Sequence, residues 1–125
     1  MRPLSTYWRV YYLQLGASPG RGKHPPCPVD TTLEDADTVD SVRVLHTPGH
    51  LAFWWPESRV LFAGDAIAIY PVFGPGWPAF MLNPTQHRAS LRRMAELDTA
   101  VLAVGHGDPL TAGAAERVRS LVEGR

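Results

Sequence analysis

Three short apolar segments of this sequence each end at a glycine-containing turn that presents a histidine or an aspartate. The segments are residues 42–45, 60–63 and 100–104, and the side chains that follow them are His50, Asp65 and His106. Proline fixes φ at about −65° and glycine accepts positive φ, so the backbone can turn sharply at the end of a strand and direct the next side chain over the sheet edge. The sequence therefore predicts three strands whose ends carry side chains that can bind a metal.

The segments between these turns favour a hairpin and two helices. Residues 51–55 are predicted to pair with residues 59–63 through the loop Pro56-Glu57-Ser58. A helix is predicted to start at Asn83-Pro84-Thr85, with His87 exposed in its first turns, and a second helix over residues 112–122. Strand, helix, strand and helix in this order place the helices on one face of a sheet, which predicts an α+β fold.

The N-terminal part of the chain has a different character. Residues 7–15 are rich in aromatic and branched side chains and predict a strand, whereas residues 16–28 are dominated by glycine, proline and serine and predict a linker. We therefore divide the chain into residues 1–30, an N-terminal strand with a Pro/Gly-rich loop, and a domain over residues 31–125. The acidic run 31–40 is interpreted as a surface turn before the next strand.

Length and charge exclude several classes of protein. The 125 residues suffice for one domain, and 12 basic against 12 acidic residues give a net charge of zero, so we expect neither nucleic acid nor an anionic membrane as a partner. The single cysteine, Cys27, excludes an intrachain disulfide and fits a reducing compartment. No run approaches the roughly 18 apolar residues of a membrane helix, and Arg9 interrupts any hydrophobic signal region, so a cytoplasmic location is expected.

The motifs TPGH, LFAGD and GHG, with RASLRRMAELD before the third, resemble the C-terminal half of the metallo-β-lactamase superfamily of metal-dependent hydrolases. The resemblance begins near residue 28 and implies the C-terminal half of a metallo-β-lactamase-type αβ/βα sandwich, with a mixed sheet and helices packed on one face. It implies that His50 and His106 each bind a metal, zinc or another divalent ion, and that Asp65 bridges two metals.

The same resemblance suggests a substrate pocket. Residues 67–81 are apolar but are interrupted by prolines and glycines, so they predict an ordered loop rather than a helix or a strand. In the family that the sequence resembles, this region often forms part of the wall of the substrate pocket. The candidate pocket residues are therefore Tyr70, Phe73 and Trp77.

The sequence also departs from the family pattern in two places. The first half of the family supplies an H-x-H-x-D-H motif, and the five histidines of this chain include no H-x-H pair. Relatives usually continue TPGH with a second turn, whereas this chain continues directly with LAFWWPE, so a shortened repeat could have removed either the ligand or its neighbour at His50. The strand at 7–15 could be the family's own N-terminal strand or unrelated sequence.

Two functions follow. The first is a metal-dependent hydrolase, in which metal-bound hydroxide attacks an ester, lactone, thioester or lactam carbonyl of a small-molecule substrate and the site is incomplete in this chain. The alternative is a non-catalytic half-fold that acts as a binding or assembly module, or a truncated remnant. Halving a sandwich exposes an apolar sheet face, so we expect a homodimer or a complementing half-domain.

Overall fold

The computed structural model describes residues 26–76 and 83–123. Residues from Leu33 onward form one compact unit, which carries all the regular structure described below. The strand predicted at 7–15 and the pocket candidate Trp77 lie outside the described residues.

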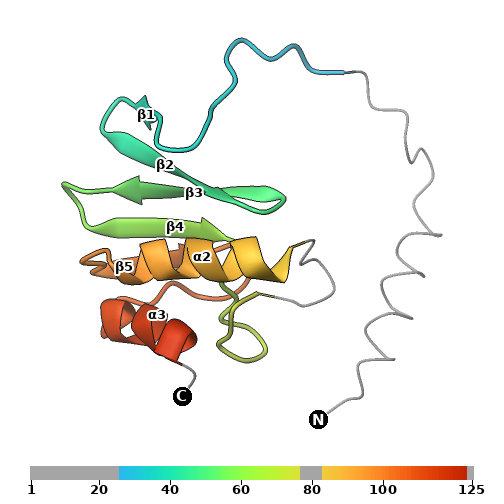
Figure 1. Ribbon diagram of the computed structural model, residues 1–125. Coiled ribbons are helices and arrows are strands. Elements are labelled where there is room, and N and C mark those ends of the chain that lie inside the picture. The colour runs from blue at the N-terminus through green and yellow to red at the C-terminus, as the bar shows by residue number, and fades with distance from the viewer. Residues whose placement is uncertain (1–25, 77–82, 124–125) are drawn as a thin grey trace. The chain divides into compact units, whose positions relative to one another are not determined.

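The centre of this unit is a mixed sheet whose strands lie side by side in chain order (Figure 1). The strands are β1 Thr38–Val39, β2 Val42–Thr47, β3 His50–Trp55, β4 Val60–Gly64 and β5 Val101–Val104. Neighbouring strands are antiparallel except β4 and β5, which are parallel. The predicted hairpin is confirmed, because Trp55 pairs with Val60 across the intervening turn.

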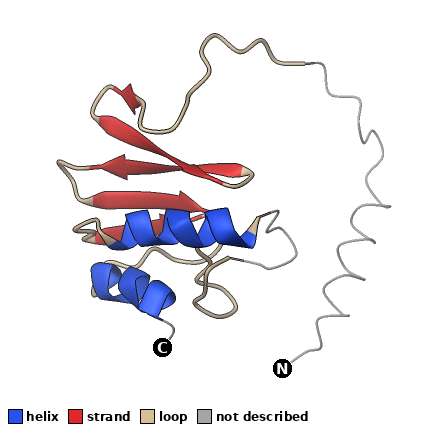
Figure 2. Ribbon diagram, viewed as in Figure 1, coloured by secondary structure: helices blue, strands red, loops and turns tan. Residues whose placement is uncertain are grey.

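Within residues 26–76 and 83–123, the helices are α2 at Pro84–Ala95 and α3 at Ala114–Glu123. Because parallel strands cannot be joined by a tight turn, α2 serves as the crossover between β4 and β5 (Figure 2). Its start is as predicted: the side chain of Asn83 accepts a hydrogen bond from the Gln86 N–H at 3.1 Å, and Pro84 is the first helical residue.

The core lies between the helices and one face of the sheet. Leu61 and Leu102 from the strands pack with Met94 of α2 and Val118 of α3, and all four side chains are at most 1% exposed. This arrangement confirms the α+β fold with helices on one face. None of the helices in the described part of the chain has the length and apolar character needed to cross a bilayer.

Alternation along the strands gives the sheet a second apolar face. Trp54 pairs with Leu61 on the core side, whereas Phe53 pairs with Phe62 on the opposite side. Phe62 is 41% exposed and Trp55, on the same face, is 37% exposed. The sheet therefore presents large apolar side chains on the face that the helices leave uncovered.

One prediction for α2 is wrong. His87 was expected to be exposed, but it is buried, with 7% of its surface accessible. Its Nε2 donates a hydrogen bond to the carbonyl oxygen of Pro75 at 2.5 Å, because the first turn of α2 packs against the loop that follows β4. An imidazole can be buried when its N–H finds an acceptor, and the spacing of apolar residues does not reveal that acceptor.

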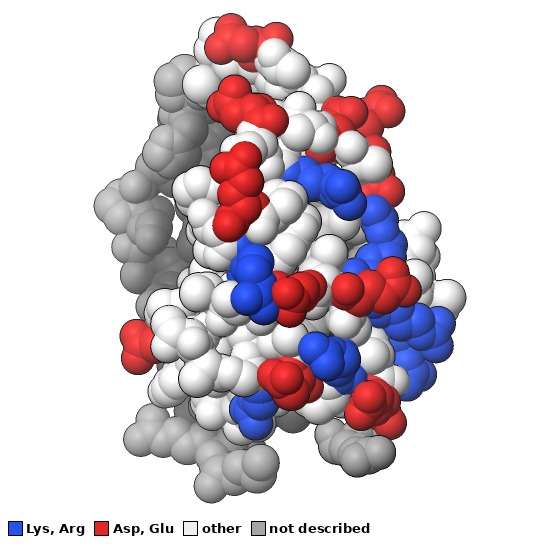
Figure 3. Space-filling model, turned by 90° about the vertical axis from the view of Figure 1, so that its left-hand side faces the viewer, with Lys and Arg blue, Asp and Glu red and all other residues white. Residues whose placement is uncertain are grey.

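On the face seen in Figure 3, acidic groups gather in the upper part of the view, and acidic and basic groups are mixed below them. Two ion pairs within the described residues join Arg59 to Asp98 at 2.7 Å and Arg93 to Asp35 at 2.9 Å.

Candidate metal centre

The topology of the sheet brings the three predicted ligands together where β4 and β5 end and β3 begins. β4 and β5 are parallel, so the residues that follow them, Asp65 and His106, lie beside each other. β3 runs antiparallel to β4, so its first residue, His50, lies at the same edge. A backbone hydrogen bond from the Gly105 N–H to the Gly64 carbonyl, 3.0 Å long, joins the ends of β4 and β5.

The carboxylate of Asp65 lies between the two imidazoles. Its Oδ2 is 3.4 Å from Nε2 of His50, and its Oδ1 is 3.4 Å from Nε2 of His106. Both distances exceed the usual range of about 2.7–3.2 Å for an N–H···O hydrogen bond. The side chains of Asp65 and His50 are each 43% exposed and that of His106 is 65% exposed, so solvent reaches all three groups.

The turns that present these side chains form for local reasons. Thr47 pairs with His50, so the connection between β2 and β3 is Pro48-Gly49, with Gly49 at φ 80°. Proline followed by a glycine with positive φ is the arrangement of a type II turn. Gly64 ends β4 at φ 54°, where the register with β5 is also irregular.

Gly105 is required for a reason that differs from turn formation. A Cβ atom built on Gly105 would collide with Oδ1 of Asp65, so any other residue at this position would require the carboxylate to move from its present place. Its φ is not in the left-handed region, so the requirement is one of space and not of backbone conformation. The sequence indicated a glycine turn here and not a contact with the carboxylate.

The described pocket candidates occupy two different environments. Tyr70 is 66% exposed, and its backbone N would lie 3.3 Å from a Cβ built on Gly107, so its loop adjoins the turn of His106. Phe73 packs against the core with the guanidinium of Arg117 over its ring, 4.3 Å from the ring centroid. The loop is closed by hydrogen bonds between Ala68 and Gly74 of 3.0 and 3.1 Å. A pocket role for these residues stays a prediction.

His50, Asp65 and His106 have the chemical types of metal ligands, but the three side chains do not converge on one point that a metal could occupy. Imidazole nitrogens and carboxylate oxygens are ligands of zinc and of iron, and protein zinc sites use three or four protein ligands. Among the described residues, no group of three or more His, Cys, Asp and Glu side chains is arranged to hold a metal ion alone. His50 with one oxygen of Asp65, and His106 with the other oxygen, each supply two metal ligands. Two ligands are fewer than the three or four that a protein zinc site uses.

The sequence did not identify a second polar cluster, formed by Asp35, Ser90 and Arg93. Asp35, from the acidic run interpreted as a surface turn, accepts a hydrogen bond from the His46 N–H at 2.8 Å and contacts Arg93. The His46 N–H, with help from the Arg93 guanidinium, holds the pKa of Asp35 below its usual value, although desolvation acts in the opposite direction. Asp35 and Arg93 are 58 residues apart, so no local pattern reveals their contact.

Comparison with known proteins places the chain in a family. The sequence model of the metallo-beta-lactamase superfamily matches residues 11–106. The match covers most of the chain, which therefore belongs to the metallo-beta-lactamase superfamily, a family of metallo-hydrolases.

Individual relatives agree with this assignment. The chain is 34% identical over 80 residues to a probable metallo-hydrolase of Bacillus subtilis (strain 168), YflN, covering 53% of this chain and 30% of that protein. It is similar to the metallo-beta-lactamase family protein TTHA1429 from Thermus thermophilus, with TM-score 0.61, 27% identity and coverage of 96% and 44% of the two chains. It is also similar to TTHA1623, solved in a di-iron-bound form, with TM-score 0.58, 32% identity and coverage of 75% and 48%. This chain thus spans less than half the length of each of these proteins.

Proposed function

We propose that this chain supplies one half of a two-metal hydrolytic site, and that a second polypeptide surface supplies the remaining ligands. The observation that supports this proposal is the position of Asp65, whose two oxygens each face a different imidazole at 3.4 Å. A carboxylate placed in this way suits a bridge between two metal ions better than it suits a single ion. Membership of a metallo-hydrolase family supports the same chemistry.

In this proposal, His50 would hold one metal, His106 would hold the other, and Asp65 would contribute an oxygen to each. A bound divalent ion, zinc or iron by its ligand types, would supply a water of lowered pKa and Lewis-acid polarisation for the carbonyl of an ester, lactone, thioester or lactam. The contribution of the chain itself is to place its three donors and to hold them in place. Gly105 contributes space for the carboxylate in its present position, since a Cβ at residue 105 would displace Oδ1 of Asp65.

Because the ligand set is partial, we expect the chain alone to have low hydrolytic activity. Misplacement of a reacting group by about 1 Å can reduce a rate by about a hundredfold, so a site that lacks part of its ligands should turn over poorly even with added metal. We expect little hydrolysis of chromogenic lactam, lactone or thioester substrates by the 125-residue chain alone.

Complementation tests this expectation. A polypeptide that carries an H-x-H-x-D-H half is mixed with this chain, zinc is added, and hydrolysis of the same substrates is followed. Activity that appears only in the mixture, and that is lost with Asp65→Ala but kept with His46→Ala, is the expected result. Zinc-dependent turnover by this chain alone that Asp65→Ala abolishes would show that the site is already complete, and an inactive mixture would contradict the hydrolase proposal.

A second candidate function is a non-catalytic binding or assembly module built on the same half-fold. It is favoured by the fact that, within residues 26–76 and 83–123, no three candidate side chains are arranged to hold a metal without help. In this case the three polar residues at the sheet edge would be inherited features of the turns. Metal-independent self-association, together with failure to bind metal in any mixture, would favour this candidate.

A further inference from the structure

The outer edge of β2 is held by groups from distant parts of the sequence. β1 has two residues and pairs only with Val42 and Arg43, so the rest of this edge needs other hydrogen-bond partners. At Val44, the N–H donates to the Asp37 carbonyl at 2.7 Å and the carbonyl accepts from the Ala36 N–H at 3.1 Å. Backbone pairing of this edge therefore continues past the end of β1.

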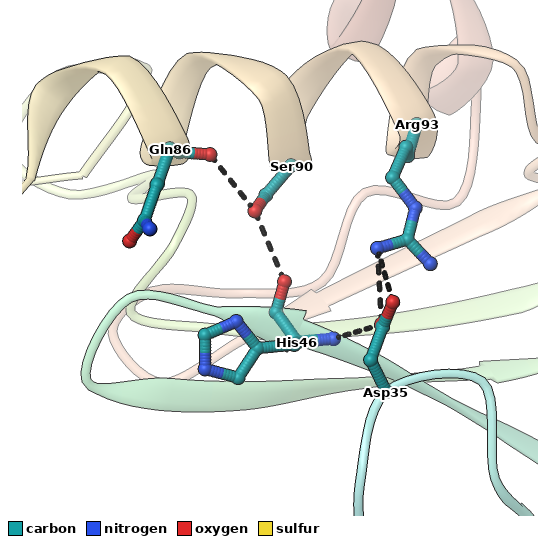
Figure 4. Close-up of polar contacts among 5 residues, drawn as sticks. All are labelled: Asp35, His46, Gln86, Ser90 and Arg93. Carbon is teal, nitrogen blue, oxygen red and sulfur yellow. Dashed lines mark hydrogen bonds and ion pairs between the residues drawn. The ribbon is translucent and has the colours of Figure 1, made fainter.

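At His46, the hydrogen-bond partners of this strand edge are side chains and not backbone groups. The His46 N–H donates to Oδ1 of Asp35 at 2.8 Å, and the His46 carbonyl accepts from the Ser90 hydroxyl at 3.0 Å (Figure 4). Both polar groups of this backbone unit are thus bound by side chains, one from the turn before β1 and one from α2. The next residue of β2, Thr47, is the last one before the Pro48-Gly49 turn.

The two side chains that hold His46 are themselves fixed. Nη1 of Arg93 lies 3.0 Å and 2.9 Å from the two carboxylate oxygens of Asp35. The Ser90 hydroxyl also lies 3.1 Å from the Gln86 carbonyl, one turn earlier in α2. Ser90 and Arg93 are three residues apart in α2, so they lie on the same side of the helix and reach the same stretch of β2. Ser90 is 8% exposed, so little water competes for its hydroxyl.

From this geometry we infer that Asp35, Ser90 and Arg93 form a clamp that positions His50 against Asp65. His46 pairs with Leu51 and Thr47 pairs with His50, so the backbone unit that the clamp holds is one rung away from the candidate ligand. Without the clamp, the N–H and the carbonyl of His46 would have no partner in the protein at this edge of the sheet. The end of β2 could then open locally, together with the turn that follows it. The three side chains act through the backbone, and they are positioning residues.

Amide hydrogen exchange of the full ¹⁵N-labelled chain tests the clamp without metal. In Ser90→Ala and Arg93→Met, exchange at His46, Thr47 and His50 should accelerate about five- to tenfold, as expected when a hydrogen bond is lost, while the core amides of Leu61 and Leu102 keep their rates. Ser90→Thr, which retains a hydroxyl, should restore the slow rates. Arg92→Met is the matched control, because Arg92 is exposed on the same helix and forms no ion pair with any of the described residues.

Uniform acceleration at every amide would show a general stabilising role and would contradict the clamp, as would unchanged exchange at His50. If Ser90→Ala does not fold, Asp35→Asn provides a milder variant, since its amide oxygen can still accept from the His46 N–H.

Because the clamp matters for metal binding only if the proposed function holds, zinc affinity is measured in parallel. A fall of about tenfold to a hundredfold in the clamp variants is expected. Failure of the wild-type protein to bind zinc, both alone and together with the H-x-H-x-D-H half, would count against the proposed function, and the exchange rates would still decide on the clamp.

Discussion

At the scale of single residues, the candidate site depends on how closely Gly105 approaches Asp65. The carboxylate faces an imidazole on each side, and on a third side it meets the backbone of Gly105, where a Cβ would collide with Oδ1. A carboxylate confined in this way has few alternative orientations. This confinement is a form of preorganisation, because the group does not need to be ordered when a ligand binds.

Gly105→Ala is predicted to weaken metal binding more than it weakens the fold. The new methyl group must displace the carboxylate, so we expect a loss in zinc affinity of about tenfold or more, comparable to the loss of an outer-shell partner. Gly74→Ala is the control, because its Cβ would meet only the Val72 carbonyl, at an ordinary contact distance of 3.9 Å. Titration of both variants with zinc measures the difference, and equal affinities would remove the steric role of Gly105.

At the scale of elements, the loop after β4 is attached to α2 by His87. The loop bounded by Ala68 and Gly74 has no regular structure beyond one bridge, and its Pro75 carbonyl accepts the Nε2 hydrogen bond of this buried imidazole. The same loop lies against Gly107 and therefore against the turn of His106. His87 therefore anchors a loop that also contacts one side of the candidate site.

His87→Leu should destabilise the protein by about 1–3 kcal/mol, because it leaves the Pro75 carbonyl without its donor. His87→Gln keeps an N–H donor and should recover part of this loss. The measurement is urea unfolding of both variants, with Arg88→Leu, an exposed neighbour on the same helix, as the control. Equal stability of His87→Leu and wild-type protein would indicate that the carbonyl finds water instead.

The contacts of Asp35, first with the His46 N–H and then with Arg93, predict how stability depends on pH. The pKa of Asp35 is lowered in the folded protein from its ordinary value of 3.8, so the stabilising charge is fully present above that value and is lost as the pH falls through the lower, folded pKa. The pair is partly exposed, with side chains 42% and 45% accessible, so the effect should be no larger than about 1 kcal/mol. Thermal unfolding between pH 6 and pH 3 should show a steeper loss in wild-type protein than in Asp35→Asn. Parallel curves would mean that Asp35 contributes nothing that depends on its charge.

Much of this arrangement could be predicted from sequence because it follows from local rules. The hairpin after Trp55, the capped start of α2 at Asn83 and the three glycine turns all come from short-range signals, and the structure confirms each element. The contacts that hold the site could not be predicted in this way. The burial of His87 and the hydrogen bond between the His46 N–H and Asp35 depend on which elements pack together in the folded protein. The residues next to them in the sequence do not indicate that packing.

At the scale of the whole molecule, the sheet face away from the helices presents partly exposed apolar side chains. The pairing of Phe53 with Phe62 lies on the side away from the helices, and Trp55 is partly exposed on the same side. Monomeric proteins rarely expose continuous apolar patches larger than about 300–600 Å². We propose that this face is covered by a second copy of the chain or by a complementing half-domain.

Self-association through this face is expected to give a dimer with two-fold symmetry, the commonest closed arrangement. Phe62→Glu should shift the protein towards monomer, because it places a charge at the centre of the contact. Arg88→Glu, on the exposed side of α2, should leave the association unchanged. Sedimentation equilibrium at micromolar concentrations measures both, and a stable wild-type monomer would contradict the dimer.

Isothermal titration of zinc into the 125-residue chain tests the central claim most directly, namely that His50, Asp65 and His106 act together as one half of a metal site. We predict that His50→Ala, Asp65→Ala and His106→Ala each reduce the affinity by about tenfold or more. His46→Ala, which removes an exposed imidazole from the adjacent strand, should bind zinc as the wild-type chain does. Zinc bound equally well by wild-type protein, His50→Ala and His106→Ala would contradict the account.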